Sequence, residues 1–473
     1  MRIVPPEPGI TLYEDGFEEP DLLQRKRLGD ALSELLNRID DPLVVALDGR
    51  WGTGKTHFLK RWIGTHARRD GGDAATVVYF DAFAHDSLGD PLPALVSALE
   101  ESVSRSGPDS PSPTRKEEIQ AMKAAAFRFA KPLARAGLAS LGGSIALSAI
   151  DELTRARNDD DANPSEGFWK AEQGRRSAME EFRQAIESLA APADGDAAGS
   201  TVVIVVDELD RCRPDYALEV LEVIKHFFTV PRLHFVLGVN LRALEGMVRA
   251  RYGAGIDARA YLAKFIQVTL DLPDEFDDAD QQKRAVLVYL DHLLGEMGIP
   301  QHVADPLREQ VRIVSRANPV SLRDVETMVS SVSLASVEVL EKPMHVYLSE
   351  GEILVMVDLV VSRTVRPDLH PKFLHASVTT SELESYLGAT EDVLREESGG
   401  QRNPAHDPGI AWRYHTWRYL SRNVRFKEDD PDVPEGITFQ FPSFSSRPPR
   451  APWDMPMDVH RRWLDLFSFF RAT

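Results

Sequence analysis

The stretch Gly49-Arg50-Trp51-Gly52-Thr53-Gly54-Lys55-Thr56 decides the fold of this chain. It follows residues 43–47 (LVVAL), a continuous apolar run that predicts a buried strand, and it precedes residues 57–62 (HFLKRW), which predict a helix. A glycine loop between a strand and a helix lets backbone N–H groups converge on phosphate oxygens at the helix N-terminus. The sequence therefore predicts a phosphate-binding loop, or P-loop, here.

The chemistry of phosphate and Mg²⁺ binding explains the residue types in this loop. Gly49, Gly52 and Gly54 allow backbone conformations that are closed to other residues. Lys55 adds a positive charge near the β and γ phosphates, and Thr56 offers a hydroxyl to the Mg²⁺ that accompanies a nucleoside triphosphate. We expect the nucleotide to contact Gly49, Arg50, Trp51, Gly52, Thr53, Gly54, Lys55, Thr56 and His57.

A second apolar run, residues 202–206 (VVIVV), ends in Asp207 and Glu208. A strand that is apolar throughout is typical of the centre of a parallel sheet, and ligands bind beyond the carboxyl ends of such strands. Asp207 is expected to hold Mg²⁺ through a water. Glu208 is expected to orient and deprotonate the attacking water. The alternative for Glu208 is a cap on the next turn.

Two further apolar runs, residues 76–80 (TVVYF) and 233–239 (LHFVLGV), predict two more strands. Asn240 follows the second and could sense a γ-phosphate, could cap the helix expected at 241–251, or could do both. Arg211, Arg259 and Arg323 compete for a role in stabilising the charge on the transferred phosphate. Each of them alone is more often a surface or salt-bridged arginine.

Several motifs together resemble the KAP family of P-loop NTPases. They are residues 49–56 (GRWGTGKT), 206–214 (VDELDRCRP), 219–226 (EVLEVIKH), 235–240 (FVLGVN) and 261–267 (YLAKFIQ), followed by Asn318-Pro319 and Arg323. The resemblance implies a P-loop α/β fold in which the strand before Asn240 lies between the strands that lead to Lys55 and Asp207. It also implies ATP rather than GTP, and hydrolysis that drives rearrangement of a protein assembly. Bacterial members are associated with membrane assemblies and with defence against phages.

The sequence departs from the family pattern at two places. Asp81-Ala82-Phe83 stands where the family commonly has Asn-Ala-Trp, which leaves the role of Asp81 open. Glu208 stands where the family commonly has a second Asp, and this change favours hydrolysis.

The expected domain organisation follows from the spacing of the motifs. More than a hundred residues separate the strand 76–80 from the strand 202–206, and a loop of that length needs structure of its own. We expect an N-terminal arm (1–20), a P-loop NTPase core with a helical lid (21–102 and 201–335), a helical insertion (103–200) and an α-rich C-terminal domain of unknown role (336–473). The charge-free run 136–150 is too short to span a membrane, although association with one is the alternative.

Two basic segments have competing interpretations. Arg25-Lys26-Arg27, within a helix expected at 21–38, could approach the nucleotide, but such a cluster is more often a solvated face. Residues 411–426 (AWRYHTWRYLSRNVRF) interleave aromatic and arginine side chains, which could stack on nucleic-acid bases. We favour an amphipathic helix whose aromatic side chains fill a core.

The composition is that of a globular protein, with 43% apolar residues among 473. The net charge of −19 disfavours binding to a phosphate backbone, so nucleic acid is a possible partner but not the favoured one. The single cysteine, Cys212, excludes an internal disulfide framework and suggests a reducing compartment. Residues 1–11 lack the apolar centre of a secretory signal. We expect a cytoplasmic location, with membrane association as the alternative.

The favoured function is an ATPase that uses ATP and Mg²⁺ to drive conformational change or assembly, with further copies of itself or a protein encoded nearby as partner. One alternative is an ATP-gated scaffold with slow turnover, and another is an ATP-dependent factor that acts on nucleic acid. The sequence contains no nucleophile elbow and no His-Glu-His metal pattern that would indicate a different chemistry.

Overall fold

The computed structural model describes residues 9–17, 21–68, 76–88, 90–105, 180, 183–184, 186–187, 201–227, 229–278, 281–335, 350–389, 408–421 and 452–464. The chain forms two compact units: residues 9–272, and residues 273–473 with 1–8. Most of the expected insertion and the start of the expected arm lie outside the described residues.

The first unit is built on a five-stranded sheet with the strand order β2-β3-β4-β1-β5. All four strand pairings are parallel. The strands are β1 (Leu43–Asp48), β2 (Thr76–Asp81), β3 (Val202–Asp207), β4 (Leu233–Val239) and β5 (Val268–Asp271). The position of β4 between β1 and β3 confirms the strand order that the family resemblance implies, and the α/β fold class is confirmed with it.

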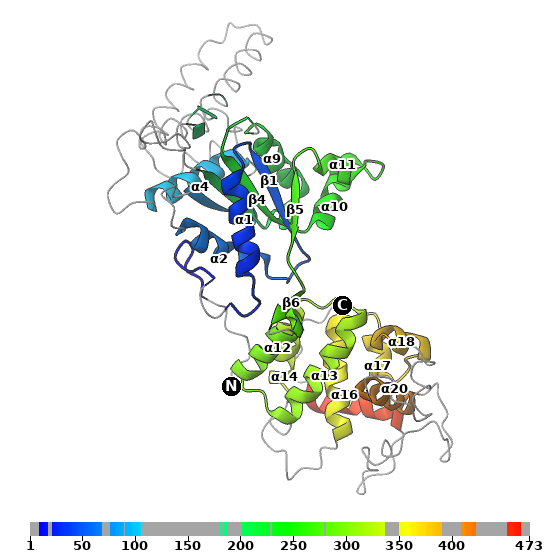
Figure 1. The fold of residues 1–473 in the computed structure, drawn as a ribbon. Coiled ribbons are helices and arrows are strands. Elements are labelled where there is room, and N and C mark those ends of the chain that lie inside the picture. Colours follow the sequence, from blue (N-terminus) through cyan, green and yellow to red (C-terminus); the bar gives the residue numbers. More distant parts are fainter. Residues whose placement is uncertain are drawn as a thin grey trace. The chain divides into compact units, whose positions relative to one another are not determined.

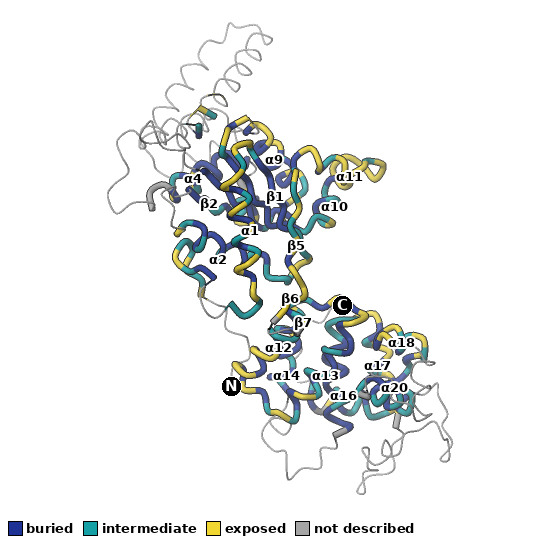
Figure 2. The backbone as a smooth tube through the Cα atoms, viewed as in Figure 1, coloured by how far each residue is buried: buried dark blue, intermediate teal, exposed yellow. Residues whose placement is uncertain are grey.

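The strands β1 to β4 are buried on both faces of the sheet, which explains why they are largely apolar. Val44 and Ala46 belong to one hydrophobic cluster, whereas Val45 and Leu47, which alternate with them, belong to another. Successive side chains of a strand point to opposite faces, so the two clusters cover the two faces of the sheet. The burial of β1 can be followed in Figure 2.

Helices cover both faces. α1 (Lys26–Arg38) and α2 (Lys55–Ala67) contribute Leu32, Leu36 and Trp62 to one cluster, and α9 (Pro214–Lys225) contributes Leu221 to the other (Figure 1). The remaining elements of this unit are α3 (Ala82–His85), η1 (Asp86–Leu88), α4 (Pro91–Arg105), η2 (Leu209–Arg211), α10 (Leu241–Tyr252) and α11 (Ala258–Leu262). The helix expected from residue 21 begins at Lys26 instead.

The second unit is mainly helical. A two-stranded antiparallel sheet of β6 (Glu275–Asp278) and β7 (Gln281–Arg284) precedes its helices. These are α12 (Ala285–Glu296), α13 (Gln301–Ala317), α14 (Leu322–Ser333), α16 (Glu350–Val365), α17 (His370–Leu374), α18 (Thr380–Leu387), α20 (Pro408–Leu420) and α22 (Met455–Val459), with a 3₁₀ turn η3 (Pro452–Asp454) and a π-helical turn η4 (His460–Leu464).

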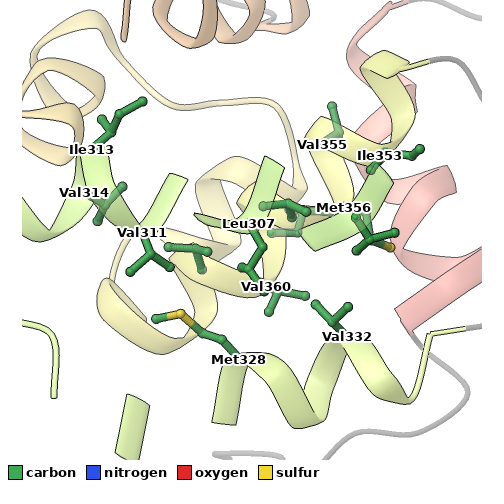
Figure 3. Packing of buried hydrophobic residues seen from close by; sticks show 14 of the residues in the cluster. Leu307, Val311, Ile313, Val314, Met328, Val332, Ile353, Val355, Met356 and Val360 are labelled. Carbon is green, nitrogen blue, oxygen red and sulfur yellow. The ribbon is translucent and has the colours of Figure 1, made fainter. Parts of the chain in front are cut away.

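The helices expected to form a lid share one hydrophobic core with the region expected to be a separate domain. Figure 3 shows Leu307 of α13, Met328 of α14 and Val360 of α16 packed in this cluster. The boundary between compact units therefore falls after Leu272 and not after residue 335. The apolar face of a helix specifies that it must be buried but not against which partner, so the expected boundary after residue 335 differs from the one in the structure.

Helix α20 fills the core of the second unit, as expected. Tyr414 and Trp417 are buried, and the buried Arg413 forms an ion pair with Asp358. The indole N–H of Trp417 donates to Oδ2 of Asp358 at 2.6 Å. Burial raises the pKa of Asp358 to about 6, and Arg413 opposes this shift. The rings of Tyr414 and Trp417 are therefore not exposed for stacking on bases.

Among the described helices, none combines the length and the apolar content needed to cross a membrane. The charge-free run 136–150 lies outside the described residues.

The first unit should lose stability in acid because of His234, which is fully buried in β4. Burial lowers the pKa of His234 from 6.5 to about 4. Between these two values the unfolded chain binds a proton that the folded unit does not, so stability is complete above pH 6.5 and falls as the pH decreases toward 4. His234→Leu should reduce the slope of unfolding free energy against pH by up to about 1.4 kcal/mol per pH unit in this window. Urea unfolding at a series of pH values measures this slope.

The matched control is His226→Leu, which removes an exposed histidine of the same unit. Equal slopes for the parent and the His234 variant would contradict the prediction.

Candidate functional site

The glycine loop connects β1 to α2 in the conformation that its sequence predicts. Gly52 and Gly54 have φ angles of 83° and 87°, a region that favours glycine. The N–H of Gly49 donates to the carbonyl of Val239 at 3.2 Å, which attaches the start of the loop to the end of β4. The hydroxyl of Thr53 donates to the carbonyl of Arg50 at 2.9 Å and closes the turn.

Lys55 is the first residue of α2 and is buried. Its ammonium group donates to the carbonyls of Gly49 at 2.5 Å and Arg50 at 3.3 Å. Burial lowers the pKa of Lys55, while the carboxylates of Asp210 and Asp207 oppose the shift. The lysine charge thus lies between the glycine loop and the acids that follow β3.

Asp207 lies at the carboxyl edge of the sheet, where the register pairs it with Asp81 on one side and Gly238 on the other. Its side chain is almost completely buried. Oδ1 accepts a hydrogen bond from the N–H of Glu208 at 2.9 Å, and the hydroxyl of Thr56 lies near the same carboxylate. Burial raises the pKa of Asp207, and Thr56 and the N–H of Glu208 oppose the shift. The proximity of Thr56 and Asp207 brings the two loops together.

Glu208 has a left-handed backbone, with a φ of 58°, and begins the turn η2. Its side chain makes no cap hydrogen bond. It forms a salt bridge of 2.8 Å with Arg211 instead. Burial raises the pKa of Glu208, and Arg211 opposes this shift. Glu208 therefore directly follows Asp207 in the chain, but its carboxylate is paired with the guanidinium of Arg211.

Asn240 and Asp81 cap helices at the same edge of the sheet. Oδ1 of Asn240 accepts a hydrogen bond from the N–H of Ala243 at 3.3 Å and so caps α10. Oδ1 of Asp81 accepts from the N–H of Ala84 at 3.0 Å and caps α3. The sequence left open whether Asn240 caps a helix, and the structure shows that it caps α10.

Arg25 is a residue of the site that the sequence analysis misjudged. The interpretation as a solvated face is correct for the exposed Lys26 and Arg27 but wrong for Arg25, which is only 5% exposed. Its guanidinium donates to the carbonyls of Thr53 at 2.8 Å and Gly54 at 3.3 Å. Arg25 thus fixes the carbonyls of the last two residues before Lys55. Nothing in the local pattern distinguishes Arg25 from its two neighbours.

Trp51 and Asp210 form a second contact between the two loops, which the sequence also did not indicate. The indole N–H of Trp51 donates to Oδ2 of Asp210 at 2.6 Å. Asp210 is buried, whereas the ring of Trp51 is 53% exposed.

The other expected residues take different positions. His57 lies on α2 with its pKa lowered to about 4 by burial and then by Arg61 and Arg25. Arg50 is exposed, and so is Arg259 on α11. Arg323 belongs to the second unit. Burial raises the pKa of Cys212 to about 12.

The residues at this edge of the sheet suit Mg²⁺ chemically. The Asp207 carboxylate and the Thr56 hydroxyl are oxygen ligands of the kind that Mg²⁺ prefers, and they are near one another. Within the described ranges, no group of three or more His, Cys, Asp or Glu side chains could hold a metal by itself. Mg²⁺ commonly takes one or two protein oxygens and completes its shell with phosphates and water.

The parallel sheet, the glycine loop at a helix N-terminus and the acid-ended strand two positions away are the features of a P-loop nucleoside triphosphatase domain. The KAP family P-loop domain matches residues 25–338, and the chain belongs to this family. No curated protein matches the chain.

Two solved structures show a weak similarity. The Aeropyrum pernix ORC2 protein in its ADPNP–ADP complexes is 13% identical over 95% of this chain and 97% of that chain, with a TM-score of 0.37. Its ADP form is 14% identical over 88% and 85%, with the same TM-score. Similarity at this level supports no conclusion about this chain.

Gly238 should be required for the position of Asp207. A Cβ atom on Gly238 would lie 2.6 Å from Oδ1 of Asp207 and 2.6 Å from a methyl carbon of Leu59. Gly238→Ala should therefore displace both side chains and destabilise the first unit by about 1–3 kcal/mol in chemical denaturation.

Gly246→Ala is the matched control. Nothing lies within 4 Å of a Cβ atom at this position in α10, so the substitution should stabilise the unit by about 0.5–1 kcal/mol. A Gly238→Ala variant as stable as the parent would show that Asp207 has room to move.

Arg25 should matter for nucleotide binding with or without Mg²⁺, because it contacts the loop and not the acids. Hydrogen bonds from a charged donor contribute about 1.5–3 kcal/mol each, so Arg25→Met should weaken the affinity for a fluorescent ATP analogue about 10- to 100-fold. Arg27→Met removes an exposed arginine from the same cluster and should bind as the parent does. Equal affinities of the two variants would rule out this role.

Proposed function

We propose that this chain is an ATPase that hydrolyses ATP with Mg²⁺ at the edge of its parallel sheet. The observation that carries the proposal is the meeting of the glycine loop with the acids that follow β3, where the indole N–H of Trp51 donates to Oδ2 of Asp210 at 2.6 Å. Lys55 is buried, and the charges of Asp210 and Asp207 act on its ammonium group. The set of a lysine, a hydroxyl and two acids is what phosphoryl transfer requires.

Each residue has a role in the proposal. The N–H groups of the loop and the Lys55 ammonium bind the β and γ phosphates, which replace the carbonyl contacts of the lysine. Thr56 and Asp207 would hold Mg²⁺, which neutralises charge on the phosphates when bound. Glu208 accepts a proton from the attacking water. Asn240 caps α10 and, in the proposal, reports to that helix whether a γ-phosphate is present.

The salt bridge between Glu208 and Arg211 favours a second candidate, the ATP-gated scaffold with slow turnover. A carboxylate paired with a guanidinium at 2.8 Å is a weaker base than a free one, so Glu208 would act only after the pair opens. Arg211 then has two possible roles. It could stabilise charge on the transferred phosphate, as the sequence suggested, or restrain Glu208.

The wider role is proposed from the family alone. ATP-driven assembly with further copies of the chain or with a protein partner, in the cytoplasm or at a membrane, and a part in defence against phages are what the KAP resemblance suggests. Light-scattering mass with and without ATP tests the assembly. The third candidate, a nucleic-acid-acting factor, loses support because Tyr414 and Trp417 are buried in α20.

Removing the base should stop turnover and preserve binding. Glu208→Gln should lower kcat at least about 100-fold, because general-base catalysis contributes that much, and should bind ATP as tightly as the parent. Lys55→Ala is the contrasting variant and should lose ATP affinity itself. Phosphate release and a binding titration measure the two quantities. A Glu208→Gln variant that turns over at the parental rate would refute the proposed hydrolysis mechanism.

Removing Arg211 should separate the two candidates. The pair is partly exposed, and such pairs contribute up to about 1 kcal/mol, so we expect Arg211→Met to raise basal turnover by up to about fivefold. Arg213→Met is the control, because Arg213 pairs with Asp86 instead. A tenfold or larger fall would assign Arg211 to charge stabilisation.

A further inference from the structure

Tyr79 contacts the acid at the centre of the site from a strand that carries no recognised motif. Its hydroxyl, on β2, donates to Oδ2 of Asp207 at 3.1 Å. The other carboxylate oxygen, Oδ1, accepts from the N–H of Glu208 at 2.9 Å. Since each oxygen has its own donor, rotation of the carboxylate is opposed from both sides.

Tyr79 is itself held by contacts to its backbone and its ring. Its strand lies at the edge of the sheet, where N–H groups have no partner strand. The N–H of Tyr79 donates to the hydroxyl of Tyr13 at 3.1 Å. The ammonium group of Lys60, on α2, lies 5.7 Å from the centre of the Tyr79 ring, within the range of a cation–π interaction. Contacts from Tyr13 and from Lys60 of α2 therefore hold Tyr79 in place beside Asp207.

We propose that Tyr79 is a positioning residue for the metal site, whose hydroxyl sets the orientation of the Asp207 carboxylate toward Mg²⁺. The inference rests on the proposed function. In that function Thr56 would bind the metal, so that Tyr79 and the N–H of Glu208 would hold the carboxylate. Groups that orient a metal ligand in this way commonly change metal affinity 10- to 100-fold when they are removed.

A purely structural role predicts a different result. If the hydroxyl of Tyr79 only satisfied a buried acceptor, its removal would lower the melting temperature and would affect nucleotide binding equally with and without Mg²⁺. If Tyr79 positions Asp207, the binding of nucleotide alone is preserved and the response to the metal changes. The two roles are separated by the metal dependence of binding, not by activity.

The experiment is a titration of the full chain and of Tyr79→Phe with a fluorescent ATP analogue, in EDTA and at a series of Mg²⁺ concentrations. We expect the affinity in EDTA to be unchanged and the Mg²⁺ concentration for half of the metal effect to rise about tenfold. Tyr289→Phe is the matched control, because Tyr289 donates to Glu326 at 2.7 Å in the second unit. An unchanged Mg²⁺ dependence, or an equal loss with and without the metal, overturns the inference.

The same titration in an Asp207→Asn background provides an independent measurement. If Tyr79 acts through Asp207, adding Tyr79→Phe to that variant should cause no further change in Mg²⁺ dependence. A full tenfold effect in this background would show that Tyr79 acts by another route. If the parent binds the analogue with a normal Mg²⁺ response and Tyr79→Phe shows the same Mg²⁺ dependence, only this inference is refuted. A parent that binds no nucleotide refutes the proposed function and the inference together.

Discussion

The parallel pairing of β4 with both β1 and β3 is the constraint on which the site depends. It places Asp48 opposite Val239 and Asp207 opposite Gly238, so that two strands distant in sequence end at one edge. A slip of one residue in β3 would turn the Asp207 side chain to the other face of the sheet. The full burial of both faces makes such a slip costly, because every apolar side chain of the strand would change sides with it.

At the carboxyl edge of the sheet, buried side chains of opposite charge lie close enough to compensate one another. Lys55, Asp207 and Asp210 are each less than a tenth exposed, and each has polar contacts within the two loops. An uncompensated charge at such depth would cost several kcal/mol, about 3–5 when one partner of a buried pair is removed. The arrangement therefore holds these side chains in place, and the proposed phosphoryl transfer would depend on such preorganisation.

The sequence predicted the parts of this site that are local and missed those that act across the fold. The apolar runs indicated β1 and β3, and the loop glycines and Lys55 followed from spacing. The order of the strands came from family resemblance, because an apolar run does not specify its neighbours. Arg25, Tyr79 and Gly238 could not be found, since each acts through a contact with a residue far away in the chain. For the same reason the packing of α13 on α16 was not foreseen.

The exposed ring of Trp51 gives this domain an intrinsic optical reporter. Its indole N–H is bonded to Asp210 at 2.6 Å, beside the lysine of the glycine loop, and half of the ring faces water. Indole emission responds to the polarity and hydrogen bonding of the ring. In contrast, Trp62 of the same unit is buried, whereas Trp453 of the second unit is 42% exposed and would add a constant background. A ligand that separates the two loops should thus change the emission spectrum of the unlabelled chain, and stopped-flow mixing could time the event.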